Sequence, residues 1–421
     1  MQHIQLVRQA IVSASSIYNA LECPNSLFDL YKSRDLRVQK SLGKGKEGEV
    51  FSLKEHRKAV LSNLLHFSGE IVIKIFQKKK NFQKYDTKVT YNSDTQKNQL
   101  VNYCSAGFIM NAVMGTLLCS ASESPFCPHF LRYFGSYIDP QGTAYSFMEK
   151  AEGDLESYLR LEPEITEKQL KSIAFMVIYS IYYMQLHYKV VHHDLHMKNI
   201  FYVRSATVVK KANANQSGYI VYKIKGKTFV IKDPGIIIKI GDFGFARAEV
   251  AVNDGPLSTL GISQSFVINE VLQNKFGGIK VYRDKKHKIN KSVSLPVAKN
   301  WGRWSADFDG SYDLQTFAVN FNSQVNQRMK ASRVSYLFPN QLLKLIGGTY
   351  ANVSGSKFID DKGTKRRVYF EKTLRPIDPS SHSPENVLLD QHFQEFSIEN
   401  NERWSDISKW KNEIALVISD I

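Results

Sequence analysis

The chain has 421 residues, of which 43% are hydrophobic and 23% are charged, so it carries enough apolar side chains for a folded core and is not predicted to be disordered. Its formal net charge of +16 favours acidic partners such as nucleic acid, anionic membrane or acidic proteins, although solvated lysine faces would give the same charge. Aromatic residues do not interleave with the lysines, so no stacking motif supports a nucleic-acid partner.

The cysteines and apolar runs set further limits. Four cysteines without a C-x-x-C pair exclude a disulfide scaffold and predict a reducing, cytoplasmic compartment. The first 21 residues lack the charged-then-apolar order of a signal peptide. The longest apolar run, Ile173 to Leu186, is shorter than the ~20 residues of a membrane span, so it predicts a buried helix and no membrane span.

The first part of the chain predicts a small, mostly antiparallel sheet with one helix. Residues 4–21 have helical spacing and form a predicted N-terminal extension, 1–35. Residues 77–97 are polar and lysine-rich and are predicted to be a loop, while residues 99–119 predict a helix. Five strands with this helix define a predicted domain at 36–150, and the strand candidates lie within 36–53 (two strands around a glycine turn), 70–76, 129–139 and 143–150.

The second part predicts a larger, mainly helical domain at 151–421. A long helix covers 165–187 and opens at Thr166 with Gln169 three residues later, which is a capping-box arrangement. Three strands follow, at 219–225, 228–232 and 236–240, and they suggest a hairpin insertion at about 203–235. An irregular stretch at about 242–310 precedes a region that reads as helices and loops. The fold class predicted for the whole chain is α+β.

Three glycines, Gly43, Gly45 and Gly48, lie between two strand candidates in the pattern G-x-G-x-x-G, and Val50 follows them. A backbone without side chains can fold over phosphates and offer N–H groups to them. A strand rather than a helix follows the glycines, which favours the protein kinase type of loop over the dinucleotide-binding type. Taken alone, the motif also fits an ordinary hairpin turn.

Lys74 lies in the middle of the apolar strand VIKIF. An ammonium group there is costly unless it meets an anion, and phosphate oxygens would serve. The alternative is an edge-strand lysine that points to solvent.

The segment Val190 to Phe201 follows the long helix and carries Asp194 and Asn199, five positions apart. A carboxylate there can orient and deprotonate an attacking hydroxyl, and an amide oxygen can bind Mg²⁺. Three histidines in the same segment would also fit a zinc site, but no second cluster of Cys or His completes one: His192, His193 and His196.

Asp242 follows an apolar strand and precedes Phe243 and Gly244, and a hard carboxylate at a strand end suits the Mg²⁺ that bridges phosphates. The order of glycine loop, strand lysine, D-x-x-x-x-N and D-F-G is typical of one family. Residues 36 to about 330 resemble the eukaryotic-type protein kinases, which implies a bilobal fold. By this resemblance Asp194 is the catalytic base, Asn199 and Asp242 are metal ligands, and Lys74 holds the α- and β-phosphates.

The resemblance implies further contacts with ATP. The backbone of Glu149 and Ala151 would hold adenine, Asp154 would reach the ribose, and the loop from Gly43 to Val50 would cover the phosphates. Asp313 resembles the buried residue that anchors the catalytic loop. A narrower similarity is to the serine/threonine kinases of large DNA viruses, which would suggest association with a virion.

The sequence departs from the family at the helix before residue 120. No Glu occurs between Glu70 and Glu123, and Gly107 or a neighbour stands where the family has its glutamate. Lys74 therefore needs another anion, for which Asp94 or the nucleotide alone is predicted. This departure puts the usual lysine–glutamate ion pair in doubt and leaves a weak or inactive enzyme as an alternative.

Other departures from the family concern the choice of substrate and the regulation of the enzyme. His193 replaces the arginine that would meet a loop phosphate, and a packed neutral histidine is favoured there over a titrating one. His196 replaces the lysine usual in serine/threonine kinases, which blurs the substrate class. No A-P-E signature follows Asp242, and the basic run 283–291 would either select acidic substrates or form a solvated loop.

The resemblance predicts an ATP- and Mg²⁺-dependent kinase that phosphorylates Ser or Thr hydroxyls of proteins. Two alternatives remain. A pseudokinase would bind nucleotide or a partner without transfer, and a small-molecule kinase would phosphorylate metabolites.

Overall fold

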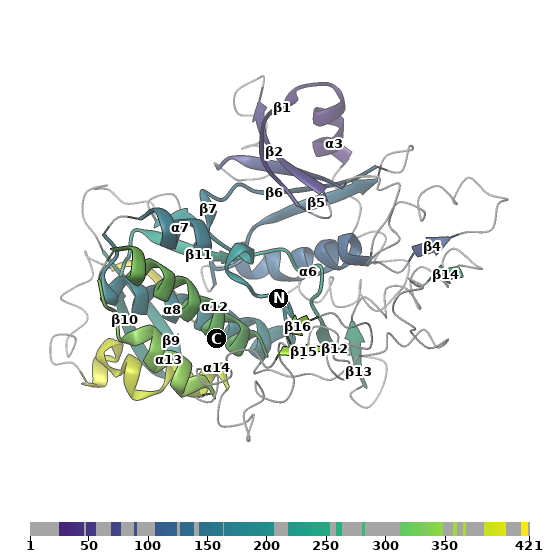
Figure 1. Ribbon diagram of the computed structural model, residues 1–421. Coiled ribbons are helices and arrows are strands. Elements are labelled where there is room, and N and C mark those ends of the chain that lie inside the picture. Colours follow the sequence, from purple (N-terminus) through teal and green to yellow (C-terminus); the bar gives the residue numbers. More distant parts are fainter. Residues whose placement is uncertain are drawn as a thin grey trace. The chain divides into compact units, whose positions relative to one another are not determined.

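The computed structural model describes residues 25–45, 48–55, 69–76, 88–90, 106–123, 127–138, 143–162, 164–205, 218–252, 258–262, 280–282, 312–332, 334–347, 357–359, 365–367, 383–400 and 414–419. These residues divide into two compact units (Figure 1). The first unit takes those within Met1–Ser120, Leu131–Lys150 and Asp242–Pro296. The second takes those within Ala121–Phe130, Ala151–Gly241 and Val297–Ile421.

The first unit is built on a five-stranded antiparallel sheet with the strand order β1-β2-β3-β6-β5. The long helix α6 belongs to the same unit up to Ser120, and it approaches β5 where Gly115 meets the ring of Tyr133 (Figure 1). The bounds are α3 Asn25–Lys32, β1 Leu36–Lys44, β2 Gly48–Glu55, β3 Ile71–Phe76, α6 Ala106–Glu123, β5 Tyr133–Ile138 and β6 Ala144–Glu149.

Apolar side chains on one face of this sheet form the first core. Leu36, Leu53, Ile73 and Phe147 are buried there, and Tyr31 of α3 packs against them. The ring of Tyr31 lies 5.7 Å from that of Tyr145 and 6.4 Å from that of Phe147. Helix α3 thus covers the sheet with apolar surface that water would otherwise contact.

The second unit contains most of the helices. A three-stranded sheet has the order β11-β8-β7, and a second one has the order β10-β9-β17. The bounds are β7 Gly153–Asp154, α7 Leu155–Leu161, α8 Glu167–Tyr188, η2 Met197–Asn199, β8 Ile200–Arg204, β9 Tyr219–Ile224, β10 Lys227–Lys232, β11 Ile236–Ile240, α12 Tyr312–Ser332, α13 Phe338–Gly347, α14 Pro384–Leu388, η8 Gln391–Phe396, η9 Ile398–Asn400 and β17 Ile414–Ser419.

Helix α8 is the centre of the second core, as its long apolar run predicts. Thr166 caps its start, and the reciprocal hydrogen bonds with Gln169 confirm the predicted capping box. The ring of Phe175 on α8 lies 5.1 Å from Tyr222 and 5.5 Å from Phe229, and it also packs on Phe393 at 5.4 Å. The inserted hairpin of β9 and β10 is therefore anchored on α8 by aromatic packing.

The predicted α+β class is confirmed, and the five strands and one helix predicted for the first domain are present. The first unit includes residues up to 150 and the second resumes at 151, while the described residues within 121–130 belong to the second unit and those within 242–296 to the first. The amide of Ile240 donates to the carbonyl of His129, which links residue 129 to β11 in the second unit. The domain bounds 36–150 and 151–421 stay predictions.

Several strands were not predicted. Within 77–97, predicted as a loop, β4 Lys88–Thr90 pairs with β14 Lys280–Tyr282. The irregular stretch contains a hairpin of β12 Ala248–Val252 and β13 Ser258–Ile262. The C-terminal region, predicted as helices and loops, also forms β15 Lys357–Ile359, β16 Lys365–Arg367 and β17. The predicted helix at 4–21 lies outside the described residues.

His129 joins three parts of the second unit and is fully buried. Its Nδ1 atom lies 2.9 Å from the carbonyl oxygen of Ile238, and its Nε2 atom lies 2.9 Å from the hydroxyl of Tyr222. Burial lowers the pKa of His129 to about 3, because the charged imidazolium cannot be solvated there. The ring therefore links β11 to the inserted hairpin as a neutral group.

This burial predicts a pH dependence of stability. The unfolded chain binds a proton at His129 below its ordinary pKa of 6.5, and the folded chain does so only near 3. The free energy of unfolding is therefore unaffected by this group above pH 6.5 and falls as the pH drops from 6.5 toward 3. His129→Gln keeps a donor and an acceptor but has no titrating group. Its free energy of unfolding, measured by urea titration, should fall less between pH 7 and pH 5 than that of the wild-type protein. An equal fall in the free energy of unfolding in both proteins would contradict the burial of His129 as a neutral group.

A second prediction concerns the close approach of β2 to β3. A Cβ atom on Gly48 would collide with the carbonyl oxygen of Ile75, whereas one on Gly43 would meet nothing within 4 Å. Gly48→Ala should destabilise the protein by about 1–3 kcal/mol through overpacking. Gly43→Ala, the matched control, should change the free energy of unfolding by less than about 1 kcal/mol. Chemical denaturation of the two variants measures this difference, and equal effects would refute the steric explanation.

Candidate active site

A buried carboxylate on α12 fixes the loop that follows α8. The Oδ2 atom of Asp313 accepts a hydrogen bond of 2.6 Å from the amide of His192, and its Oδ1 atom accepts one of 2.9 Å from the amide of His193. Asp313 is 0% exposed, and His193 adopts a left-handed backbone with φ of 62°. Two amide donors offset the cost of burying the charge, so the loop conformation is held where the sequence predicted an anchor.

The same loop presents Asp194 and Asn199. The Nδ2 atom of Asn199 donates to the carbonyl oxygen of Asp194 at 2.9 Å, and the amide of His196 donates to that oxygen at 2.8 Å. The side chain of Asp194 is 13% exposed, so its carboxylate is partly accessible, and Asn199 is buried. The amide of Asn199 is thereby oriented, and its Oδ1 atom is the one left to act as a ligand.

His196 lies beside the proposed base. Its Nε2 atom is 3.8 Å from the Oδ2 atom of Asp194, and its Nδ1 atom accepts a hydrogen bond from the amide of Lys198 at 3.3 Å. His196 thus caps the short helix η2 that carries Asn199. The three histidines of the loop have separate surroundings, because His192 and His193 are buried. Across the described residues, no group of three or more His, Cys, Asp or Glu side chains gathers to hold a metal ion.

The end of β11 is tied to this loop. The Nε2 atom of His192 lies 3.0 Å from the carbonyl oxygen of Gly241, and the amide of Gly241 donates to the carbonyl oxygen of Asn199 at 3.2 Å. Asp242 comes next in the chain and adopts a left-handed backbone with φ of 62°. That conformation is uncommon outside glycine but tolerated by Asp, and it marks residue 242 as a constrained position.

Within the first unit, the ammonium of Lys74 meets the carboxylate of Asp242. The Nζ atom of Lys74 lies 3.3 Å from the Oδ1 atom of Asp242, and the Nδ2 atom of Asn111 on α6 donates to the same oxygen at 3.0 Å. The prediction that Lys74 needs a partner other than a helix glutamate is thus met by Asp242. Asp94, the partner that the sequence suggested, lies outside the described residues.

The register of the sheet places three predicted residues of the first unit in one row. Gly43 pairs with Val50 across β1 and β2, and Val50 pairs with Lys74 across β2 and β3. The amide of Gly45 donates to the carbonyl of Gly48 at 2.8 Å, which closes the turn. Leu42, which sequence reasoning did not single out, is 45% exposed at the start of this turn. An exposed leucine beside glycines offers an apolar surface for a flat ring.

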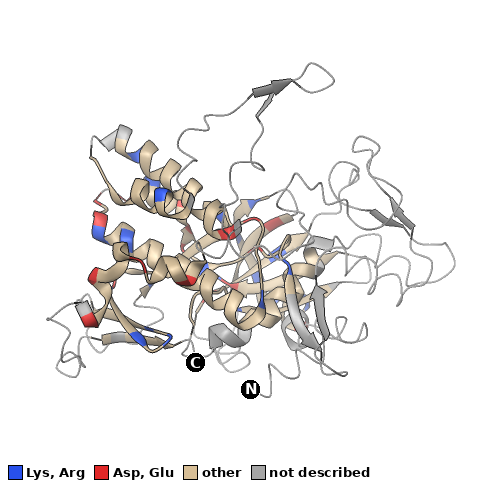
Figure 2. Cartoon of the chain, turned by 90° about the horizontal axis from the view of Figure 1, so that it is seen from below, with Lys and Arg blue, Asp and Glu red and all other residues tan. Residues whose placement is uncertain are grey.

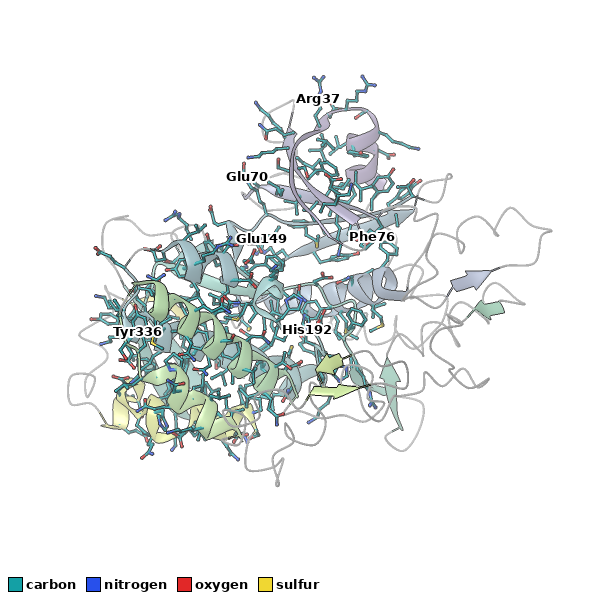
Figure 3. The ribbon with its side chains drawn as sticks, in the orientation of Figure 1. Arg37, Glu70, Phe76, Glu149, His192 and Tyr336 are labelled. Carbon is teal, nitrogen blue, oxygen red and sulfur yellow. The ribbon has the colours of Figure 1, made fainter. Side chains whose placement is uncertain are left out.

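Glu149, one of the predicted adenine contacts, is the last residue of β6. Glu149 is buried there and Arg37 projects from the sheet on β1 (Figure 3). The carboxylate of Glu149 accepts a hydrogen bond from the amide of Arg132 at 3.1 Å, so it stabilises the sheet. The amide of Lys150 donates to the carbonyl of Glu70 at 2.9 Å. The assignment of Glu149 to the adenine-binding hinge stays a prediction.

Ala151 and Asp154 belong to the second unit. The Oδ1 atom of Asp154 accepts a hydrogen bond from the amide of Ser157 at 2.8 Å, and its Oδ2 atom accepts one from the Ser157 hydroxyl at 3.1 Å. Asp154 is therefore the N-cap of α7. A ribose contact would have to share this carboxylate, and it stays a prediction, as does the adenine contact of Ala151.

Each of the two predicted metal ligands has a side chain that suits magnesium. Asn199 and Asp242 supply an amide oxygen and a carboxylate, which are the hard oxygen ligands that Mg²⁺ prefers. Two protein ligands are also the usual number where nucleotide phosphates and waters complete the coordination. The assignment of both residues as metal ligands stays a prediction.

Basic residues are spread over several helices and strands of the described chain, and acidic residues are scattered there too (Figure 2). Several take part in ion pairs, such as Lys171 with Glu395 at 2.6 Å and Lys225 with Glu385 at 2.8 Å. The basic run 283–291 lies outside the described residues. The helices that the structure describes include none long and apolar enough to cross a membrane.

Comparison with known proteins agrees with this arrangement. The family model of the protein kinase domain matches residues 36–282, which is more than half of the chain. A probable serine/threonine-protein kinase of Dictyostelium discoideum is 38% identical over 95 residues. That alignment covers 22% of this chain and 7% of the relative, so the chain matches only a small part of that protein. The matched range begins at β1 and includes the glycine turn, Lys74, the Asp194 loop and Asp242, and we conclude that the chain belongs to the protein kinase family.

Proposed function

We propose that the protein transfers the γ-phosphate of ATP to Ser or Thr hydroxyls of protein substrates, with Mg²⁺ as cofactor. The observation that carries the proposal is the loop fixed by Asp313, which presents Asp194 and Asn199 from one rigid segment. Membership of the protein kinase family supports phosphotransfer. The Dictyostelium relative's description as a probable serine/threonine-protein kinase supports the class of hydroxyl.

Asp194 is the proposed catalytic base. Its backbone is fixed at both ends, since its amide donates to the Nδ1 atom of His192 at 3.3 Å and its carbonyl accepts from Asn199. A carboxylate on a fixed backbone can accept the proton of a substrate hydroxyl and align its oxygen with the γ-phosphorus. The phosphoryl group moves to that oxygen and ADP leaves. The protein contributes mainly position and charge.

Lys74, Asn199 and Asp242 are the proposed nucleotide and metal residues. The ammonium of Lys74, whose side chain is 14% exposed, has three N–H donors and can hold Asp242 and phosphate oxygens together. Asn199 and Asp242 would hold Mg²⁺, which when bound neutralises charge on the transferring phosphates. The glycine turn would cover the phosphates, while Leu42 and Val50 would lie against the base. Glu149, Ala151 and Asp154 complete the proposed nucleotide contacts.

The departure at α6 favours a second candidate. The ammonium of Lys74 forms an ion pair with the carboxylate of Asp242 at 3.3 Å, so the lysine and the proposed metal ligand offset each other's charge. A protein in which this pair persists with nucleotide bound would bind ATP without transferring phosphate, as a pseudokinase does. Thermal-shift titrations with ATP, with and without Mg²⁺, combined with a phosphotransfer assay separate the two functions. Binding without transfer would favour the pseudokinase.

Two substitutions test the proposed mechanism. Asp194→Asn keeps the shape of the side chain but removes the base, and it should lower turnover by about 10²–10⁴-fold, the range of general-base catalysis. Asp242→Ala removes the proposed metal ligand and should lower turnover by a similar or larger factor. Transfer of radiolabel from γ-labelled ATP to a generic protein substrate, or to the protein itself, is the measurement.

Asp390→Asn is the matched control. Asp390 caps η8 by accepting a hydrogen bond from the amide of His392 at 2.9 Å, and this variant should transfer phosphate at the wild-type rate. Circular dichroism and thermal melting would establish that all variants fold. Wild-type transfer rates in both Asp194→Asn and Asp242→Ala would disprove the mechanism.

A further inference from the structure

Helix α6 provides an amide where a glutamate was expected. Asn111 lies one helical turn after Gly107, the position at which the sequence suggested that the glutamate had been lost. Its Nδ2 atom donates to the Oδ1 atom of Asp242 at 3.0 Å, and Lys74 reaches the same oxygen at 3.3 Å. The helix therefore contacts the carboxylate of this cluster through a neutral donor.

The charges of the cluster explain why an amide suits this position. The ammonium of Lys74 balances the carboxylate of Asp242, and Asn111 adds a donor without adding charge. A carboxylate at position 111 would lie about 3 Å from that of Asp242, and two like charges at such a distance cannot both be stable beside one ammonium. Asn111 thus holds Asp242 in a way that a glutamate or aspartate cannot.

The helix around Asn111 is packed firmly against the sheet, so Asn111 can hold another side chain in place. Its neighbours Phe108 and Ala112 on α6 are 0% exposed, and the ring of Phe108 packs on Phe76 at 4.8 Å. Gly115, one turn further along α6, approaches the ring of Tyr133 on β5 so closely that a Cβ atom would collide with it. The helix is therefore fixed to the sheet on both sides of Asn111. The side chain of Asp242, in contrast, is 40% exposed and needs donors to fix its orientation.

We propose that Asn111 is a positioning residue, whose amide orients the Asp242 carboxylate for the metal-bound nucleotide. This inference rests on the proposed function, because it names what prepares Asp242 for its ligand. Lys74 must also serve phosphate oxygens once ATP is bound, whereas the amide of Asn111 remains with the carboxylate. The contact between α6 and Asp242 then replaces the lysine–glutamate pair as the link between this helix and the nucleotide residues.

The test measures metal-dependent nucleotide binding instead of turnover. Asn111→Leu has a similar volume and removes the donor. With the non-hydrolysable analogue AMP-PNP, the Mn²⁺ concentration that gives half of the maximal thermal shift should rise about tenfold, the effect of losing one hydrogen bond to a charged group. The affinity for AMP-PNP in the presence of EDTA should stay within about twofold of wild type, because Asn111 is proposed to act on the metal ligand alone.

Thr116→Val is the matched control on the same helix. It removes the 2.8 Å hydrogen bond from the Thr116 hydroxyl to the carbonyl of Ala112 and leaves the donors of Asp242 intact. Its Mn²⁺ requirement should equal that of wild type. If Asn111→Leu does not fold, Asn111→Ala removes the same donor with a smaller side chain and carries the test.

A double-mutant cycle gives a readout that is independent of nucleotide. Melting temperatures of Asn111→Leu, Asp242→Ala and the double variant without metal should be non-additive, since both single changes remove one contact. Additive effects, or a wild-type Mn²⁺ requirement in folded Asn111→Leu, would overturn the assignment of Asn111 alone. A wild-type protein that binds no AMP-PNP with or without Mn²⁺ would overturn the proposed function and, with it, the role of Asn111.

Discussion

The hydrogen bonds from two loop amides to the buried carboxylate of Asp313 are the interaction on which the candidate active site depends. They join α12 to a loop more than a hundred positions earlier in the chain. A buried carboxylate without such donors would be strongly destabilising, so the loop and the charge stabilise each other. The left-handed backbone of His193 persists because these amides are held. Asp194, Asn199 and the end of β11 take their positions from this loop.

The first unit also contains a charged group that needs a partner, and here the group is a lysine. A lysine in an apolar strand needs an anion, and Asp242 supplies it at 3.3 Å. Helix α6 contributes the amide of Asn111 to the same carboxylate, which adds a donor without adding a charge. In the sequence, the helix lacks the glutamate that the family has at this place. In the structure, the same helix contacts Asp242 through Asn111. Helix α6 donates to the carboxylate of Asp242, and Lys74 pairs with the same carboxylate.

The inserted hairpin is integrated into the second unit by contacts that are distant in sequence. Phe175 on α8 packs on Tyr222 and Phe229, and the hydroxyl of Tyr222 meets the ring of His129. His129 also holds Ile238 on β11, the strand that leads to Asp242. Because these residues are fully buried and the ring is neutral, the insertion and the end of β11 share one rigid core.

Local patterns in the sequence determined most elements of the two domains and the candidate residues. The capping box at Thr166, the β-branched strand around Lys74 and the order of the glycine turn, Asp194, Asn199 and Asp242 need only neighbouring residues to be read. Contacts between distant residues were decided by the tertiary structure alone. Strand β17 pairs in parallel with β9, and β4 pairs with β14, although each segment is short or polar by itself. The roles of Asn111 as donor to Asp242 and of Asp154 as N-cap also emerged only there, because a hydrogen bond depends on where side chains meet in space.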